Sequence, residues 1–207
     1  KIDRDFFLKR KIPIKLDYVF HCGNSGNKKK VNERSNEDFI NCINLLLNLY
    51  KKIITKKIIL ISTISVRVEK NSYAVNRDLV EVIFKNLFIN SLIIRLPVIF
   101  NYDQKRGILY DILNSKKIYL SKDTTINPLT LSEVVSNVYK SKKLKGLIEL
   151  GSRQTISLNK FAKLFNSNSI FTGKKYNLTS IDSGMNSDLK KILIEIRSIY
   201  KNWYHKF

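Results

Sequence analysis

The segment KIILIST at residues 57–63 is almost wholly apolar and opens into a polar loop. Two runs of the same kind flank it along the chain, LDYVFHC at 16–22 and SLIIRLP at 91–97. Near-continuous apolar runs of this length predict strands that are buried on both faces. The first run ends at Gly23-Asn24-Ser25-Gly26, which predicts a tight loop, and the third is stopped by Pro97.

Two amphipathic helices are expected between these strands, at 36–52 and 73–89, because their apolar residues recur at the 3.6-residue period. Ser35 is the expected cap of the first helix. Strands that alternate with helices predict a parallel sheet, and the fixed handedness of the crossovers makes it part of a doubly wound α/β fold.

The pattern changes after residue 101. We expect helices at 105–114, 132–140, 157–166 and 187–204, and strands at 117–120 and 146–150. Residues 1–101 are therefore expected to form the sheet domain, and residues 102–207 a smaller mixed α/β lobe interleaved with it.

The chain is strongly basic, with 38 Lys and Arg against 17 Asp and Glu and a formal net charge of +21. Such a charge usually points to a polyanion. However, Lys supplies 29 of the 38, Asn and Ile are also abundant, and all three are encoded by A/T-rich codons. The basic residues are also spread along the whole chain. We therefore do not expect nucleic acid as the main partner, and an anionic small molecule suits the positive field better.

Cysteine and histidine are scarce: Cys22 and Cys42 form no CxxC pair, and His21 and His205 lie far apart in sequence. No metal site and no disulfide scaffold is expected. No apolar run approaches the roughly 18 to 20 residues of a membrane-spanning helix. We expect a cytoplasmic protein.

Polar residues at the strand ends are the candidates for chemistry, because ligands of doubly wound sheets bind outside the carboxyl ends of the strands. Tyr73 and Arg77 stand four residues apart on the second helix and therefore share one face. A cation beside a phenol is expected to lower the tyrosine pKa. A hydroxyl from Thr63 or Ser62 at the end of the neighbouring strand could hold a substrate oxygen. These are the parts of a proton-transfer site at a carbonyl or carbinol.

In this order the motifs DYVFHCGNS, IILISTISV, YAVNR and SLIIRLPVIF resemble the extended short-chain dehydrogenase/reductases, and more narrowly the NAD-dependent epimerase/dehydratase family that acts on nucleotide sugars. The later stretch NPLTLSEVVSNVYK…GLIELGSRQTISLNKFAKLF resembles the substrate lobe of that family. The resemblance covers roughly residues 16–166. It implies a partial Rossmann-like, doubly wound parallel sheet with a smaller mixed α/β substrate lobe.

The resemblance also implies an activity and a cofactor. The activity is NAD- or NADP-dependent epimerisation, dehydration or reduction of a nucleotide sugar, as in polysaccharide biosynthesis. Tyr73 would be the general acid/base, Thr63 or Ser62 would orient the substrate oxygen, and Arg77 would stand where the family has a lysine that bonds the nicotinamide ribose. The residues implied along the cofactor are Cys22, Gly23, Asn24, Arg77, Pro97 and Val98.

Three features depart from the family pattern. The phosphate-binding Gly-x-x-Gly-x-x-Gly turn of the first strand–helix unit is missing. We therefore expect a truncated Rossmann-like domain that begins just before the fourth strand and contains the later strands only. Arginine replaces the lysine, and only nine residues separate Thr63 from Tyr73. An alternative is therefore a degenerate, catalytically inactive Rossmann-like binding or structural protein. Family members commonly dimerise through the helices expected here at 36–52 and 73–89, so a homodimer is also expected.

Overall fold

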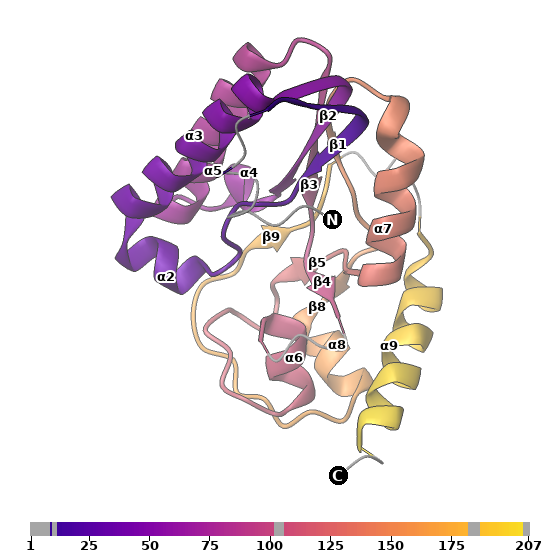
Figure 1. Cartoon of the computed structure of the whole chain (residues 1–207). Coiled ribbons are helices and arrows are strands. Elements are labelled where there is room, and N and C mark those ends of the chain that lie inside the picture. The colour runs from indigo at the N-terminus through magenta and orange to yellow at the C-terminus, as the bar shows by residue number, and fades with distance from the viewer. Residues whose placement is uncertain (1–8, 10–11, 102–105, 182–186, 205–207) are drawn as a thin grey trace. The chain divides into compact units, whose positions relative to one another are not determined.

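The computed structural model describes residues 9, 12–101, 106–181 and 187–204 and shows two compact units (Figure 1). Unit 1 comprises residues 1–95 and 142–148, and unit 2 comprises residues 96–141 and 149–207. Within the described part of the chain, no helix combines the length and the apolar character that crossing a membrane requires.

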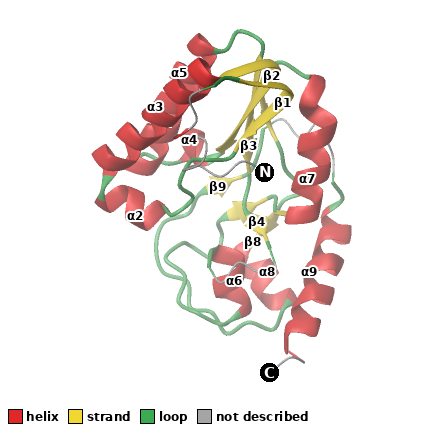
Figure 2. Ribbon diagram, viewed as in Figure 1, coloured by secondary structure: helices red, strands yellow, loops and turns green. Residues whose placement is uncertain are grey.

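The centre of unit 1 is a four-stranded parallel sheet (Figure 2). Its strands are β1 (Ile14–His21), β2 (Ile53–Thr63), β3 (Ser91–Leu96) and β7 (Gly146–Glu149), in the order β1-β2-β3-β7. β1 and β2 run parallel from the pair Ile14–Ile53 to the pair His21–Leu60. The α/β class and the parallel sheet predicted from the three apolar runs are thus confirmed, and β1 is an edge strand of this sheet.

Two long helices, α3 (Ser35–Lys52) and α5 (Ser72–Leu87), pack together on one face of this sheet (Figure 1). Their apolar stripes form a core with side chains from the strands beneath. The buried members of this core are Val19, Cys42, Leu45, Leu46, Leu49, Ile58, Leu60, Val80, Phe84 and Ile93. The helices expected at 36–52 and 73–89 are therefore present, within one or two residues of the expected bounds.

Local details of unit 1 differ from the expectation. α3 begins at Ser35 itself, and its N-cap is Arg34, which makes no side-chain capping bond, so the expected Ser35 cap is wrong. The patterns did not predict two short helices, α2 (Lys28–Glu33) and α4 (Ser65–Val68), which follow the ends of β1 and β2. Helices of one turn or two hold too few residues to show an apolar period.

Unit 2 mixes short strands with helices, and two small sheets organise it. In the first, β4 (Ile99–Phe100) pairs parallel to β6 (Leu129–Thr130). In the second, β5 (Thr125–Ile126) lies between β8 (Ile156–Ser157) and β9 (Asn177–Leu178). The helices are α6 (Ile108–Leu113), α7 (Leu131–Lys140), α8 (Leu158–Leu164) and α9 (Leu189–Tyr204).

The sequence predicted the four α-helices that the structure describes in unit 2, but it missed the short strands there and predicted one strand that is absent. Residues 117–120 do not form a strand, since Ile118 makes only an isolated bridge to Phe171. A further one-turn 3₁₀ helix spans Ser141–Lys143. The short pairings of unit 2 join segments that lie far apart in the chain, and each is too brief for its pattern to be read locally.

Candidate active site

The end of β2 and the start of α5 bring the predicted catalytic residues to one place in unit 1. β2 ends at Thr63, and α5 starts at Ser72 after its N-cap Asn71, whose side chain accepts a hydrogen bond from the backbone N–H of Ala74 at 3.0 Å. Tyr73 follows directly, and its own backbone N–H donates to Asn32 Oδ1 of α2 at 2.9 Å. Both caps hold the first turn of α5, so Tyr73 is fixed at its backbone.

Tyr73, Thr63 and Arg77 meet in this structure. The Tyr73 side chain is buried, and the Thr63 hydroxyl at the end of β2 lowers its pKa. The Arg77 guanidinium carbon lies 5.1 Å from the centroid of the Tyr73 ring, on the shared helix face. Sequence spacing alone predicted this cluster, and the catalytic roles of its members stay predictions.

Ser62, the alternative hydroxyl, is engaged elsewhere. It donates to Glu81 Oε1 at 2.6 Å, and the same carboxylate binds Arg95 through Nε at 3.0 Å and through the second guanidinium nitrogen at 2.8 Å. This buried group ties the ends of β2 and β3 to α5. Of the two candidate hydroxyls, the structure therefore places only Thr63 at Tyr73.

The protonation of Tyr73 differs from the expectation. Burial raises the pKa of Tyr73 above its ordinary value, and it outweighs the opposing effect of the Arg77 charge. The nearby Glu69 carboxylate also raises it, while hydrogen bonds from Arg77 and Thr63 lower it. The expected net lowering of this pKa by Arg77 is therefore wrong, because the phenol lies in a site with little water.

Arg77 is bound inside the protein, with only 2% of its side chain exposed. One terminal nitrogen lies 2.7 and 2.8 Å from the two carboxylate oxygens of Asp38, and also donates to the Ser25 carbonyl at 3.4 Å. The other donates to Cys42 Sγ at 2.9 Å. Burial lowers the pKa of Arg77, but Cys42 and Asp38 together outweigh it and raise the pKa. The guanidinium is therefore a positive charge beside Tyr73, and Asp38 and Cys42 of α3 hold it in place.

Asp38 was not among the residues predicted for this site, although its place in the sequence carries a signal. Asp38 stands on the same stripe of α3 as Cys42, Leu45 and Leu49, which are all buried. A carboxylate on the apolar stripe of a helix needs a cationic partner, because an isolated buried charge is costly. The pattern therefore indicates a buried ion pair, but not which of the 38 basic residues completes it.

The loop after β1 holds the residues implied along a cofactor. Gly23 has no room for a side chain, since a Cβ there would lie 2.6 Å from Leu45 Cδ2 and 3.0 Å from His21 Cε1. Cys22 is exposed. The Oδ1 atom of Asn24 is buried and has no hydrogen-bond partner among the described residues. An acceptor of this kind can take a hydrogen bond from a ligand hydroxyl, and the predicted contact of this loop with a cofactor stays a prediction.

Pro97 and Val98, which the resemblance also implies at the cofactor, belong to unit 2. Pro97 is buried at the end of β3, and the Val98 carbonyl accepts a hydrogen bond from the backbone N–H of Leu129 at 3.1 Å. That bond continues the pairing of β4 with β6. Their predicted contact with a cofactor stays a prediction.

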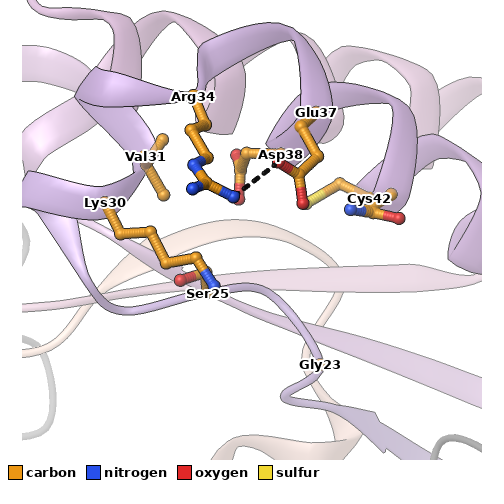
Figure 3. A pocket seen from close by; sticks show the side chains of 9 residues that line it. Gly23, Ser25, Lys30, Val31, Arg34, Glu37, Asp38 and Cys42 are labelled. Carbon is orange, nitrogen blue, oxygen red and sulfur yellow. Dashed lines mark ion pairs between the residues drawn. The ribbon is translucent and has the colours of Figure 1, made fainter.

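A cavity of about 140 Å³ opens beside this loop in unit 1 (Figure 3). Gly23 and Ser25 line one side, and the first turns of α3 line the other. Lys30 extends toward Ser25, and Arg34 forms an ion pair with Glu37 at 3.6 Å (Figure 3). Pockets for drug-sized ligands usually measure about 300–1,000 Å³, so this cavity by itself is too small for a dinucleotide or a nucleotide sugar.

Comparison with known proteins shows that the chain shares its fold with several solved structures. No protein-family model matches the chain, and no curated protein matches it in sequence. Several solved structures do match. Pal from Bacillus thuringiensis has a TM-score of 0.70 at 16% identity, over 96% of this chain and 79% of that one.

Two further matches carry the names of sugar-nucleotide enzymes. UDP-glucose 4-epimerase from Thermotoga maritima has a TM-score of 0.63 at 14% identity, over 84% of this chain and 69% of that one. A dTDP-4-dehydrorhamnose reductase from Clostridium acetobutylicum has a TM-score of 0.70 at 15% identity, over 89% of this chain and 81% of that one. At these identities the likeness shows the fold, which is that of Rossmann-like epimerases and reductases.

Proposed function

We propose that this chain belongs to an enzyme that uses NAD or NADP to epimerise, dehydrate or reduce a nucleotide sugar, with Tyr73 as its acid/base. The observation that carries the proposal is the meeting of Tyr73, Thr63 and Arg77 where β2 ends, in a fold shared with such epimerases and reductases. The net charge of +21 suits an anionic substrate.

In this proposal the chain's own residues transfer the proton and orient the reacting oxygen. Tyr73 exchanges its phenolic proton with a sugar oxygen, and Thr63 bonds the same oxygen and orients it. Arg77, bound to Asp38, provides a fixed positive charge that favours the phenolate as the proton leaves. Asn24 Oδ1 is the acceptor for a ribose hydroxyl. When bound, the nicotinamide supplies or accepts the hydride.

Burial raises the pKa of Tyr73, so the phenol is neutral at physiological pH and holds a proton that it can donate to a keto-sugar oxygen during reduction. In the reverse oxidation the same phenol takes up that proton as a base, and the Arg77 charge favours the phenolate that this step needs.

The test begins with binding of NADH and NADPH to the full chain, followed by oxidation of the bound cofactor with keto nucleotide sugars. We expect micromolar binding and turnover, and Tyr73→Phe should abolish turnover while leaving cofactor binding within about twofold. Tyr119→Phe, which removes a hydroxyl from an exposed side chain, is the matched control. A Tyr73→Phe protein with full activity would show that Tyr73 is not the acid/base.

A binding or structural protein without turnover is the second candidate. The observation in its favour is the burial of Arg77, whose terminal nitrogens are engaged by Asp38, Cys42 and Ser25. This candidate predicts cofactor or nucleotide-sugar binding with no hydride transfer in the same assay. Tyr73→Phe would then leave the affinity for the cofactor and the nucleotide sugar unchanged, and neither protein would transfer hydride.

We also propose that the chain dimerises through α3 and α5. Both helices expose large apolar side chains on the surface away from the sheet, and they pack against each other. The exposed set is Ile40, Leu47, Tyr50, Val75, Leu79 and Val82. Analytical ultracentrifugation should give a dimer, and Leu79→Lys should give a monomer with an unchanged far-UV circular dichroism spectrum. Leu164→Lys, on α8 of unit 2, is the control.

A further inference from the structure

The amino edge of the unit 1 sheet lies at the other end of the strands from Tyr73, and lysines gather there. All strands of a parallel sheet begin at the same edge, so the residues that open β1, β2, β3 and β7 lie along it. α3 and α5 also end at this edge, just before β2 and β3 (Figure 1). We call residues 12–17, 51–57, 85–91 and 142–146 the amino-edge surface. It carries nine lysines: Lys15, Lys51, Lys52, Lys56, Lys57, Lys85, Lys142, Lys143 and Lys145.

The excess of positive charge is specific to this edge. Elsewhere in residues 12–95 and 142–148, eight basic residues are accompanied by six acidic ones. At the amino-edge surface the nine lysines meet a single acid, Asp17, whose Oδ1 already binds Lys56 Nζ at 2.8 Å. Codon bias acts on every position alike, so it does not explain an excess at one edge. The dipoles of α3 and α5 favour cations in their last turns, but this accounts for only three of the nine.

Contacts between the strands join these segments into one surface. Asn90, which precedes β3, donates through Nδ2 to the Lys56 carbonyl of β2 at 2.6 Å. The Lys57 side chain is buried, and its Nζ lies 3.4 Å from Asn90 Oδ1 and 3.5 Å from the Ser91 carbonyl, which are both neutral acceptors. Burial and the charge of nearby Lys145 lower the pKa of Lys57. The cations of neighbouring strands therefore face one another at this edge.

Each strand of the sheet also begins beside an exposed aliphatic side chain. Ile12 precedes β1, Ile54 opens β2, Ile89 precedes β3 and Leu144 precedes β7. Ile89 is 98% exposed, so almost its whole side chain is in water. Aliphatic side chains among lysines suit a lipid surface, because the acyl region takes up the apolar groups while anionic headgroups meet the ammonium groups. Single-stranded nucleic acids instead favour aromatic side chains on which bases stack.

We propose that the amino-edge surface binds the anionic face of a phospholipid membrane, with Ile89 and Leu144 entering the boundary between headgroups and acyl chains. This inference is independent of the proposed function. Tyr73 follows the opposite ends of the same strands, so membrane binding leaves that edge of unit 1 open to solution. Each lysine close to an anionic membrane raises the affinity by about fivefold, and this attraction fades beyond a Debye length, so binding should weaken as salt rises.

The test is co-sedimentation of the full chain with sucrose-loaded vesicles. We expect binding to phosphatidylcholine vesicles that contain about 30% phosphatidylserine, and no binding to vesicles of phosphatidylcholine alone. Raising the salt from about 0.1 to 0.5 M should release most of the chain. The double variant Lys143→Gln/Lys145→Gln should lower the partition coefficient by about 25-fold. Ile89→Ser should lower it by about tenfold, because an apolar side chain no longer leaves water.

Two matched controls separate this surface from net charge and from general stickiness. Lys29→Gln/Lys70→Gln removes two exposed lysines from segments that follow the carboxyl ends of β1 and β2, and it should change the partition coefficient by less than about threefold. Ile170→Ser truncates an exposed isoleucine of unit 2 and should change nothing. Far-UV circular dichroism should show that every variant is folded like the parent chain.

Three results overturn the inference. The first is a chain that does not bind the anionic vesicles, including one that instead binds a random single-stranded oligonucleotide at the same salt. The second is an equal loss of affinity in the two double-lysine variants, which would make net charge the cause. The third is an Ile89→Ser protein that binds the vesicles as tightly as the parent chain does.

Discussion

Replacing Asp38 with leucine would leave the Arg77 guanidinium buried without its carboxylate. The pair joins α3 to α5 through two contacts of 2.7 and 2.8 Å, and only 9% of the Asp38 side chain and 2% of the Arg77 side chain are exposed. After the substitution, the cation keeps the Ser25 carbonyl, the Cys42 sulfur and the face of the Tyr73 ring, but no carboxylate among the partners that the structure gives it. Removing one partner of a buried pair costs about 3–5 kcal/mol.

Arg77→Met and the double variant Asp38→Leu/Arg77→Met complete a double-mutant cycle with Asp38→Leu. Arg77→Met should cost about as much as Asp38→Leu, because it leaves the carboxylate without its cation, with the Asn76 amide at 3.2 Å as a remaining donor. The double variant replaces both charges with apolar side chains of similar size, and such replacements are often neutral or even stabilising. The free energy of unfolding should therefore drop with each single substitution and recover in the double variant, with a coupling of at least about 3 kcal/mol.

Urea denaturation followed by far-UV circular dichroism measures these free energies. With a slope near 2–3 kcal/mol per molar, each single variant should unfold at about 1–2 M less urea. Glu37→Ala removes an exposed ion pair from the same turn of α3 and should change the free energy of unfolding by less than about 0.5 kcal/mol. If the two single effects simply add in the double variant, the buried pair does not stabilise α3 on α5 and the reasoning fails.

Three other substitutions probe the core, the strand-end loop and the ion pair of Glu69. Phe84→Ala should lower the free energy of unfolding by about 3–5 kcal/mol, because the ring is fully buried between α5 and the sheet; a loss below about 1 kcal/mol would contradict this packing. Gly23→Ala should cost about 1–3 kcal/mol, since its Cβ would meet Leu45 at 2.6 Å. Gly26→Ala is its control, with nothing within 4 Å, and equal losses would rule out the clash. Burial raises the pKa of Glu69, but the ion pair with Lys28 and hydrogen bonds from Asn71 and Ser65 outweigh it and hold the pKa below its ordinary 4.5. Its contribution to stability is therefore complete above pH 4.5 and declines as the pH falls through its folded-state pKa. In urea denaturation at pH 2–6, Glu69→Gln should make the free energy of unfolding decline less steeply as the pH falls. An unchanged decline would mean that other carboxylates cause it.

Much of the fold could be predicted from the sequence because it depends on local periodicity. The apolar runs ending at His21, Thr63 and Leu96 mark strands, and the 3.6-residue stripes mark α3 and α5. The same periodicity places Tyr73 and Arg77 on one helix face. The short strands of unit 2 escaped prediction, because their two-residue segments gain stability only from partners far along the chain.

The candidate site shows where local patterns stop being sufficient. Consecutive residues of a strand point to opposite faces, so the sequence determined that Ser62 and Thr63 cannot both face Tyr73. Only the tertiary structure decided that Thr63 does, while Ser62 turns to Glu81. Likewise, the sequence placed a cation beside the phenol, but the packing of α3 on α5 paired that cation with Asp38 and buried the phenol. Burial and pairing depend on distances between segments far apart in the chain, and the spacing of residues along one helix does not encode those distances.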